Sequence, residues 1–302
     1  MKIFLTGATG FVGSVVAEKL KDRGLKVSTL ARNEIAEAKL RGKDIEIVHG
    51  GLNDSNALKR AASESDAVIH TAFSHNFDDY NDAVRLDREA VNSLAESLAE
   101  TNKPFIVTSS SAVLGDTRGT EADEDYPFAE SSSRRLRGEV ERDCLHLSSK
   151  GIRSIVLRLP LFVYGRAGSS FVPFLIEQAK KAGSANYIGL GDSRVSAIHV
   201  ETAADLYLLA LETSTAKGLY NVAAETVSIK ELSEAAARLL DVKAKSISAD
   251  EAREQFGRMF EFLSINNQLD ATKARRELDW SPDSFTTITD DIENGSYRKF
   301  RE

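Results

Sequence analysis

A glycine-rich turn near the start of the chain has the spacing of a phosphate-binding loop. Gly7, Gly10 and Gly13 stand in the run Thr6-Gly7-Ala8-Thr9-Gly10-Phe11-Val12-Gly13. Gly7 permits a sharp turn, Gly10 lets the backbone approach a pyrophosphate, and Gly13 lets the following helix pack closely on the strand. That helix would direct free N–H groups and the positive end of its dipole at the phosphates. Lying between a strand and an amphipathic helix, the turn predicts a bound dinucleotide rather than a tight turn that binds nothing.

The end of the second expected strand bears on which dinucleotide is bound. It reads Leu30-Ala31-Arg32-Asn33. An acidic residue here would accept hydrogen bonds from the adenosine ribose and repel a 2′-phosphate, whereas an arginine would pair with that phosphate. Arg32 therefore predicts NADP(H), with NAD(H) as the alternative if Arg32 is only a solvated residue at the head of the next helix.

The elements that position these residues alternate between strand-like and helix-like stretches. Runs that are apolar on both faces, each followed by a helix, predict a Rossmann-type, doubly wound parallel sheet covered on both sides. In such a sheet, ligands bind beyond the carboxyl ends of the strands. The expected strands of the first half are Lys2–Thr6, Lys26–Ala31, Ile45–Val48, Ala67–Thr71, Phe105–Ser109 and Ser154–Leu159.

After Pro160 the pattern loosens. Ser228 followed three residues later by Glu231 predicts a capped helix start, and the strand-like segment 218–222 predicts a return to the sheet. The expected helices are Phe171–Gly183, Val200–Glu212 and Ser228–Leu240. We therefore expect a smaller, interleaved C-terminal substrate lobe. The expected division is a Rossmann domain over 1–165, with 192–227 returning to it, and a substrate lobe over 166–191 and 228–302.

Several segments together resemble the extended short-chain dehydrogenase/reductase superfamily, which includes NAD(P)-dependent epimerases and dehydratases. The likeness covers almost the whole chain and rests on the glycine turn, Gly50–Asp54, Val68–Ala72, Thr108–Gly115, Arg158–Pro160, Val163–Gly165, Ile198–Val200 and Leu278–Pro282. Gly51 departs from it by replacing the usual acidic adenine contact. The resemblance implies an active-site serine at Ser110 and a cofactor site formed by Gly7, Thr9, Gly10, Phe11, Val12, Gly13, Arg32, Leu52, Thr71, Ala72, Phe73, Ser109, Arg135 and Pro160.

The stretch that resembles the catalytic segment differs from the superfamily pattern at residues that matter for the chemistry. The superfamily uses a tyrosine followed four residues later by a lysine, the tyrosine exchanging a proton with the substrate oxygen. Aligned on Glu139, Ser131 takes the tyrosine place and Arg135 the lysine place; one register earlier gives Glu130 and Arg134. A serine hydroxyl is a far weaker acid than a phenol, and an arginine cannot shuttle protons. The chain thus resembles atypical extended members that lack the usual catalytic pair.

Other residues are weaker candidates for the chemistry. Ser110 would orient a substrate oxygen or simply cap a turn. Tyr164 would serve as a replacement acid or as a packing residue, and His199 would transfer protons or stay structural. Four aromatic residues would line an apolar substrate pocket: Phe171, Phe174, Tyr187 and Phe262. No spacing predicts a metal site.

The composition limits the kinds of partner and the cellular compartment that we expect. The chain has 302 residues and a net charge of −7 with no basic stripe, which argues against nucleic acid as a partner. The single cysteine, Cys144, excludes an internal disulfide and indicates a reducing compartment. No leader and no apolar run near the roughly 20 residues of a membrane helix is visible. We expect a soluble cytoplasmic protein without membrane association, and the resemblance implies a homodimer.

These features predict an NADP(H)-dependent oxidoreductase acting on a small carbonyl or alcohol compound. Arg135 would hold the nicotinamide ribose or a substrate anion, and Ser110 the substrate oxygen. A non-catalytic sensor of NADP(H) is the alternative that the missing pair supports. Epimerase or dehydratase chemistry with bound NAD is a third reading, against which Arg32 and the missing tyrosine count.

Overall fold

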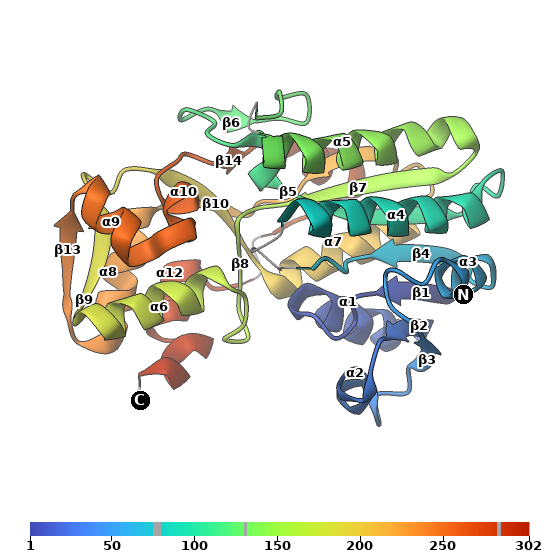
Figure 1. The fold of residues 1–302 in the computed structure, drawn as a ribbon, viewed down its shortest axis with the longest axis horizontal. Coiled ribbons are helices and arrows are strands. Elements are labelled where there is room, and N and C mark those ends of the chain that lie inside the picture. The colour runs from blue at the N-terminus through green and yellow to red at the C-terminus, as the bar shows by residue number, and fades with distance from the viewer. Residues whose placement is uncertain (75–79, 130–131, 283–284, 302) are drawn as a thin grey trace.

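A large parallel sheet forms the centre of the computed structural model, which describes residues 1–74, 80–129, 132–282 and 285–301. Within these residues the sheet has seven strands in the order β11-β7-β5-β4-β1-β2-β3, and every neighbouring pair is parallel (Figure 1). The strands are β1 (Lys2–Thr6), β2 (Lys26–Ala31), β3 (Glu46–His49), β4 (Ala67–His70), β5 (Pro104–Ser110), β7 (Arg153–Leu159) and β11 (Gly218–Asn221). This is the Rossmann order with one further strand at the β7 edge.

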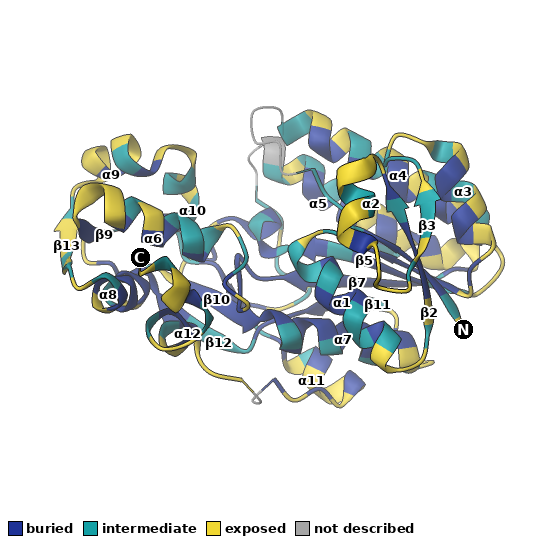
Figure 2. Cartoon of the chain, turned by 90° about the horizontal axis from the view of Figure 1, so that it is seen from below, coloured by how far each residue is buried: buried dark blue, intermediate teal, exposed yellow. Residues whose placement is uncertain are grey.

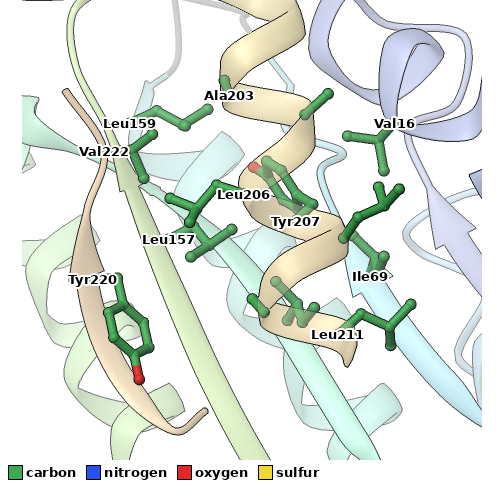
Figure 3. Packing of buried hydrophobic residues seen from close by; sticks show 14 of the residues in the cluster. Val16, Ile69, Leu157, Leu159, Ala203, Leu206, Tyr207, Leu211, Tyr220 and Val222 are labelled. Carbon is green, nitrogen blue, oxygen red and sulfur yellow. The ribbon is translucent and has the colours of Figure 1, made fainter. Parts of the chain in front are cut away.

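Helices cover both faces of the large sheet because its strands carry apolar side chains on both sides. One face packs against α1 (Phe11–Asp22), α2 (Glu34–Leu40), α7 (Val200–Glu212) and α11 (Thr272–Leu278). In Figure 3, Leu206 and Tyr207 of α7 lie among Val16, Ile69 and Leu157. The opposite face packs against α3 (Ser55–Ser63), α4 (Tyr80–Leu98) and α5 (Ser132–His146), with the 3-10 turn η3 (Leu147–Lys150) after it.

A second body of structure lies beyond the carboxyl ends of the large sheet (Figure 1). It contains a three-stranded sheet of β8 (Phe162–Tyr164), β10 (Arg194–His199) and β12 (Glu225–Ser228), and a parallel pair of β9 (Ser184–Ile188) and β13 (Lys243–Ile247). A separate core cluster joins them to helices α6 (Phe171–Ala182), α8 (Ile229–Leu240), α9 (Ala249–Phe256), α10 (Phe260–Leu263) and α12 (Ile288–Glu293). The short turns η4 (Gly257–Met259) and η5 (Ser296–Phe300) complete this body.

Short segments connect the two bodies. The strand pair β6 (Glu121–Ala122) and β14 (Gln268–Leu269) and the 3-10 turn η2 (Ser111–Leu114) lie between them. The expected return of 218–222 to the large sheet is confirmed as β11, and Ser228 with Glu231 forms a capping box at the start of α8. Within 192–227, α7 and β11 pack on or join the large sheet, whereas β10 belongs to the three-stranded sheet. The division into two domains stays a prediction.

A buried ion pair joins helix α5 to three strands of the large sheet. Arg158 of β7 donates to both carboxylate oxygens of Glu141 on α5, and each side chain is only 1% exposed. Ser109 of β5 donates to Glu141 at 2.5 Å, and Asn221 of β11 accepts from Arg158 at 3.1 Å. The pair therefore fixes α5 against three adjacent strands.

The central strands β1, β4 and β7 of the large sheet are largely buried, whereas the edge strand β3 is partly exposed (Figure 2). Among the described residues, no helix combines the length and the apolar character that crossing a membrane requires.

Candidate active site

A large cavity extends along the carboxyl ends of the strands. Its volume is about 1300 Å³, above the roughly 300–1,000 Å³ of a pocket for one small ligand. One end is lined by the glycine turn and by residues that follow β2, β3 and β4, and the other by residues of α6, η4 and α10. The cavity thus has room for a dinucleotide and a second, smaller molecule.

In the glycine turn, side chains in place of the glycines would occupy space that the turn now leaves open or would collide with the backbone. Gly7 has a φ of +84°, and a Cβ on Gly13 would lie 2.2 Å from the Gly7 carbonyl oxygen. Gly10 is the N-cap of α1 and offers no side-chain hydrogen bond, so the N–H groups of the first turn stay available to a ligand. A turn of this shape at the start of a 12-residue helix fits a pyrophosphate, as the spacing predicts.

Arg32 and Gly51 mark the far side of this end. Both line the cavity, and a Cβ on Gly51 would lie 3.9 Å from the Arg32 Cβ. Arg32 is exposed, so its guanidinium can swing over a phosphate without losing a buried partner. Because position 51 carries no acidic side chain, Arg32 is the charged side chain among the described residues that line this corner.

The structure brings most of the predicted residues to this cavity. Thr71, which follows β4, donates from its hydroxyl to the Thr6 carbonyl oxygen at 2.8 Å and so closes the floor beneath the glycine turn. The predicted residues that line the cavity are Gly7, Thr9, Gly10, Phe11, Val12, Gly13, Arg32, Leu52, Thr71, Ala72, Phe73, Ser109, Ser110 and Pro160.

The two serines at the end of β5 differ in what they can do. Ser109 is buried and its hydroxyl is used by Glu141. Ser110 is half-buried and caps η2 by accepting from the backbone N–H of Ala112 at 3.2 Å. That bond uses an acceptor lone pair and leaves the hydroxyl hydrogen of Ser110 free to be donated to a substrate oxygen.

Arg137 is the basic residue of α5 that lines the cavity. It pairs with Asp87 of α4, donates to the Thr108 carbonyl oxygen at 2.7 Å, and lies over the Phe73 ring at 4.8 Å. Its side chain is 9% exposed, so it is held in one position with an edge toward the cavity. The sequence places Arg137 in the basic run Arg134–Arg137, of which Arg135 was the residue expected to act in the site.

Behind Arg137, a chain of buried groups leads back to the glycine turn. His70 lies 3.1 Å from Asp87 through Nε2 and 2.7 Å from the Thr6 hydroxyl through Nδ1. Burial disfavours the charged form of Asp87, but Arg137 and His70 outweigh burial and hold the pKa of that carboxyl below its ordinary value. Asp87 is therefore ionised at neutral pH and fixes both partners.

Arg135 does not reach the cavity, which corrects the register expected for α5. Its side chain is 70% exposed and pairs with Glu139 on the same outer face. The buried face of α5 instead carries residues three or four apart: Arg137, Val140, Glu141 and Cys144. Alignment on Glu139 selected the wrong face because two positions along a helix are rotated by about 200°. Of the other register, Arg134 stacks on Phe262 at 5.6 Å, while Glu130 and Ser131 lie outside the described residues.

Tyr164 is also not placed for proton transfer. Its hydroxyl lies 2.7 Å from Glu225 and 2.7 Å from the Thr286 carbonyl oxygen, on the side of β8 away from the cavity. Burial, followed by the Glu225 charge, raises the pKa of its phenol above the ordinary value. His199 is structural as well, because it caps α7 through Nδ1 and stacks on Phe285 at 4.5 Å.

The end of the cavity away from the glycine turn is apolar. Phe171, Phe174 and Phe262 line it as expected. Tyr187 does not, since it packs beneath Lys230, whose Nζ lies 5.7 Å from the ring centre. Met259 and Leu161 complete this wall. Among the described residues, no group of three or more His, Cys, Asp or Glu side chains is arranged to hold a metal ion.

The sheet order, the glycine turn and the cavity together define a Rossmann-type dinucleotide-binding protein. A model of the NAD dependent epimerase/dehydratase family matches residues 3–223, and the chain belongs to that family.

The chain is also similar to individual proteins. The chain is 39% identical over 293 residues to the uncharacterized protein C2A9.02 of Schizosaccharomyces pombe, covering 96% of this chain and 98% of the other. It is 26% identical over 221 residues to a 2-alkyl-3-oxoalkanoate reductase of Stenotrophomonas maltophilia, covering 70% and 65%. Its fold matches a UDP-glucose 4-epimerase of Thermotoga maritima with a TM-score of 0.80, at 18% identity over 100% of both chains.

Proposed function

We propose that the protein is an NADP(H)-binding oxidoreductase of the atypical extended short-chain dehydrogenase type, acting on a small carbonyl or alcohol compound. The observation that carries this proposal is the continuity of one cavity from Arg32 and the glycine turn to Ser110, Arg137 and an apolar wall. The name of the Stenotrophomonas relative, a reductase of an oxoalkanoate, supports carbonyl chemistry.

Each part of the site has a separate role in this proposal. The backbone N–H groups of the α1 start hold the pyrophosphate, and Arg32 pairs with the 2′-phosphate. NADPH, when bound, supplies a hydride to a carbonyl carbon. Ser110 donates a hydrogen bond to the substrate oxygen, which polarises the carbonyl.

Arg137 takes the role first expected of Arg135. Fixed by Asp87, its guanidinium holds a ribose hydroxyl or stabilises negative charge on the substrate oxygen, without moving a proton. Tyr164 is engaged elsewhere, so water or a group of the substrate would supply the proton.

The first test is a titration with NADPH, NADP⁺, NADH and NAD⁺ by calorimetry, with an Arg32→Ala variant. We expect NADPH to bind most tightly, and the variant to lose at least about tenfold in NADPH affinity while NADH affinity is unchanged, since one charge-assisted contact contributes roughly 1.5–3 kcal/mol. Arg41→Ala is the matched control, because Arg41 is exposed at the end of α2 and does not line the cavity. Absence of binding by all four nucleotides would refute the proposal.

A non-catalytic sensor of NADP(H) is the second candidate, and the fixed Arg137–Asp87 pair favours it because neither group exchanges a proton near neutral pH. NADPH binding without oxidation across a broad panel of aldehydes and ketones would favour the sensor. Substrate-dependent oxidation that Arg137→Met abolishes would exclude it.

The proposal includes a cytoplasmic location and a homodimer. The lone cysteine is consistent with a reducing compartment. The long helices α4 and α5 lie side by side on one face of the large sheet and offer a dimer surface (Figure 1). Light scattering of the purified chain checks the dimer.

A further inference from the structure

The wall of the cavity opposite the glycine turn is formed by apolar side chains that a charged group would not contact favourably. Phe171 and Phe174 come from α6, Met259 from η4, Phe262 from α10, and Leu161 from the link between β7 and β8. Phe171 and Phe262 meet edge to face, with ring centres 5.7 Å apart. Their partial exposure to the cavity leaves apolar surface that a ligand would remove from water.

The charges of the cavity lie elsewhere. Among the described lining residues, the charged ones are Arg32, Asp82 and Arg137. Arg32 lies at the adenosine end, and Arg137 is already paired with Asp87 beside the expected carbonyl position. A nucleoside diphosphate sugar brings two negative charges that need cations or several free N–H groups. The apolar wall offers no unpaired cation, because Arg134 stacks on the Phe262 ring and pairs with Glu261 at 3.5 Å. The polar groups beside the wall are Ser169, Ser170 and the uncapped start of α6, where Pro173 removes one N–H from the first turn.

We infer that the substrate is an apolar aldehyde or ketone, with its carbonyl at Ser110 and its hydrocarbon part against Phe171, Phe174 and Phe262, and that it is not a nucleotide sugar. The carbonyl part of this inference rests on the proposed function. The hydrocarbon part rests on the apolar wall alone. In the reaction, hydride from NADPH forms the new C–H bond, the C=O π pair becomes an alkoxide, and a water proton converts the alkoxide to the alcohol.

The test measures binding before turnover, so that the two proposals can fail separately. The protein, alone and with NADPH, is titrated calorimetrically with methyl ketones whose alkyl chain lengthens by one methylene at a time, and with UDP-glucose. We expect affinity to rise roughly fourfold per methylene until the wall is covered, and UDP-glucose not to bind. Ketone binding without NADPH oxidation would leave this inference standing and contradict the oxidoreductase. Binding of UDP-glucose, or affinity independent of chain length, would overturn the inference.

Two phenylalanines of the same short helix give a matched pair of variants. Phe262→Ala removes a ring that lines the cavity, whereas Phe260→Ala removes one that lies beneath Arg253 and does not line it. We expect the first to weaken binding of the longest ketone about tenfold, as loss of contact with roughly 55 Å² of apolar surface would, and the second to leave it unchanged. If Phe262→Ala does not fold, Met259→Ala tests the same wall and is expected to give a smaller loss of the same sign. Equal effects of the lining and control variants would count against the inference.

Discussion

At the scale of single residues, the two arginines of α5 separate the cavity face from the solvent face. Arg137→Met removes the buried guanidinium, and we expect NADPH-dependent turnover to fall by at least about a hundredfold, the size of effect seen when one preorganised charge-stabilising donor is lost. Arg135→Met removes only an exposed ion pair, so turnover is expected to stay within about twofold. Steady-state rates with one ketone check both. A larger loss in Arg135→Met than in Arg137→Met would restore the register expected from the sequence.

The sequence carried a signal that would have found Arg137. Apolar residues Val140 and Cys144 recur at helical spacing with Arg137 and Glu141, which places all four on one face. Alignment on the single residue Glu139 does not take that periodicity into account. The contact between Asp87 and His70 was not predicted for another reason: it joins α4 to the end of β4, and sequence spacing does not encode such a contact.

Asp87 also makes a prediction for acid stability. Because its pKa is lowered in the folded protein, its contribution to the free energy of unfolding is fully present above the unfolded-state pKa of about 4 and is lost as pH falls through the folded-state pKa. We expect the double variant Asp87→Asn, Arg137→Gln to lose less stability between about pH 4 and pH 2 than the original chain. Urea unfolding across that range measures it. Parallel acid profiles would show that Asp87 is not linked to folding.

At the scale of elements, the approach of α1 to β1 depends on Gly13. A methyl group there would meet the Gly7 carbonyl oxygen at 2.2 Å, so the helix start must move. We expect Gly13→Ala to abolish NADPH binding and Gly10→Ala to weaken it less, because the corresponding Cβ contact at Gly10 is 3.2 Å. Calorimetry gives the affinities, and circular dichroism shows whether the variants remain folded. Similar affinities for the two variants would contradict the close approach.

The buried Arg158–Glu141 pair makes a second prediction at this scale. Glu141→Gln leaves an uncompensated guanidinium among β5, β7 and β11, and we expect a loss of roughly 3–5 kcal/mol in the free energy of unfolding. The exposed pair of Arg23 and Glu212 is the comparison: Glu212→Gln should cost less than about 1 kcal/mol. Urea denaturation midpoints distinguish the two. Equal losses would mean that the buried pair does not hold these strands together.

Most strands of the large sheet were predictable because they contain a run of three apolar residues, as β1, β4, β5 and β7 do. β1, β2 and α7 begin and end where the pattern indicates. The three-stranded sheet was not predicted, because its strand β8 has only three residues, too few to show a period. The glycine turn was predictable since its function is encoded by local spacing, whereas the apolar wall is assembled from three separate segments.

At the scale of the whole molecule, the two bodies are joined across the ligand cavity, so ligand binding is expected to stabilise the folded chain. NADPH at about a hundred times its dissociation constant should add roughly 2.7 kcal/mol to the free energy of unfolding. Thermal melts with and without the nucleotide measure the shift, and the Gly13→Ala variant is expected to show none. An equal shift in both would indicate a binding site away from the glycine turn.

Cys144, on the buried face of α5, can be used to measure local opening of the protein. It is the single cysteine of the chain, it is 0% exposed, and burial raises the pKa of its thiol. Reagents that modify cysteine attack the thiolate, so they can reach Cys144 only when α5 lifts from the sheet. The half-time of Cys144 labelling in the unmodified protein therefore measures how often α5 opens. If a nucleotide or a ketone lengthens that half-time, the change would report binding without any attached dye.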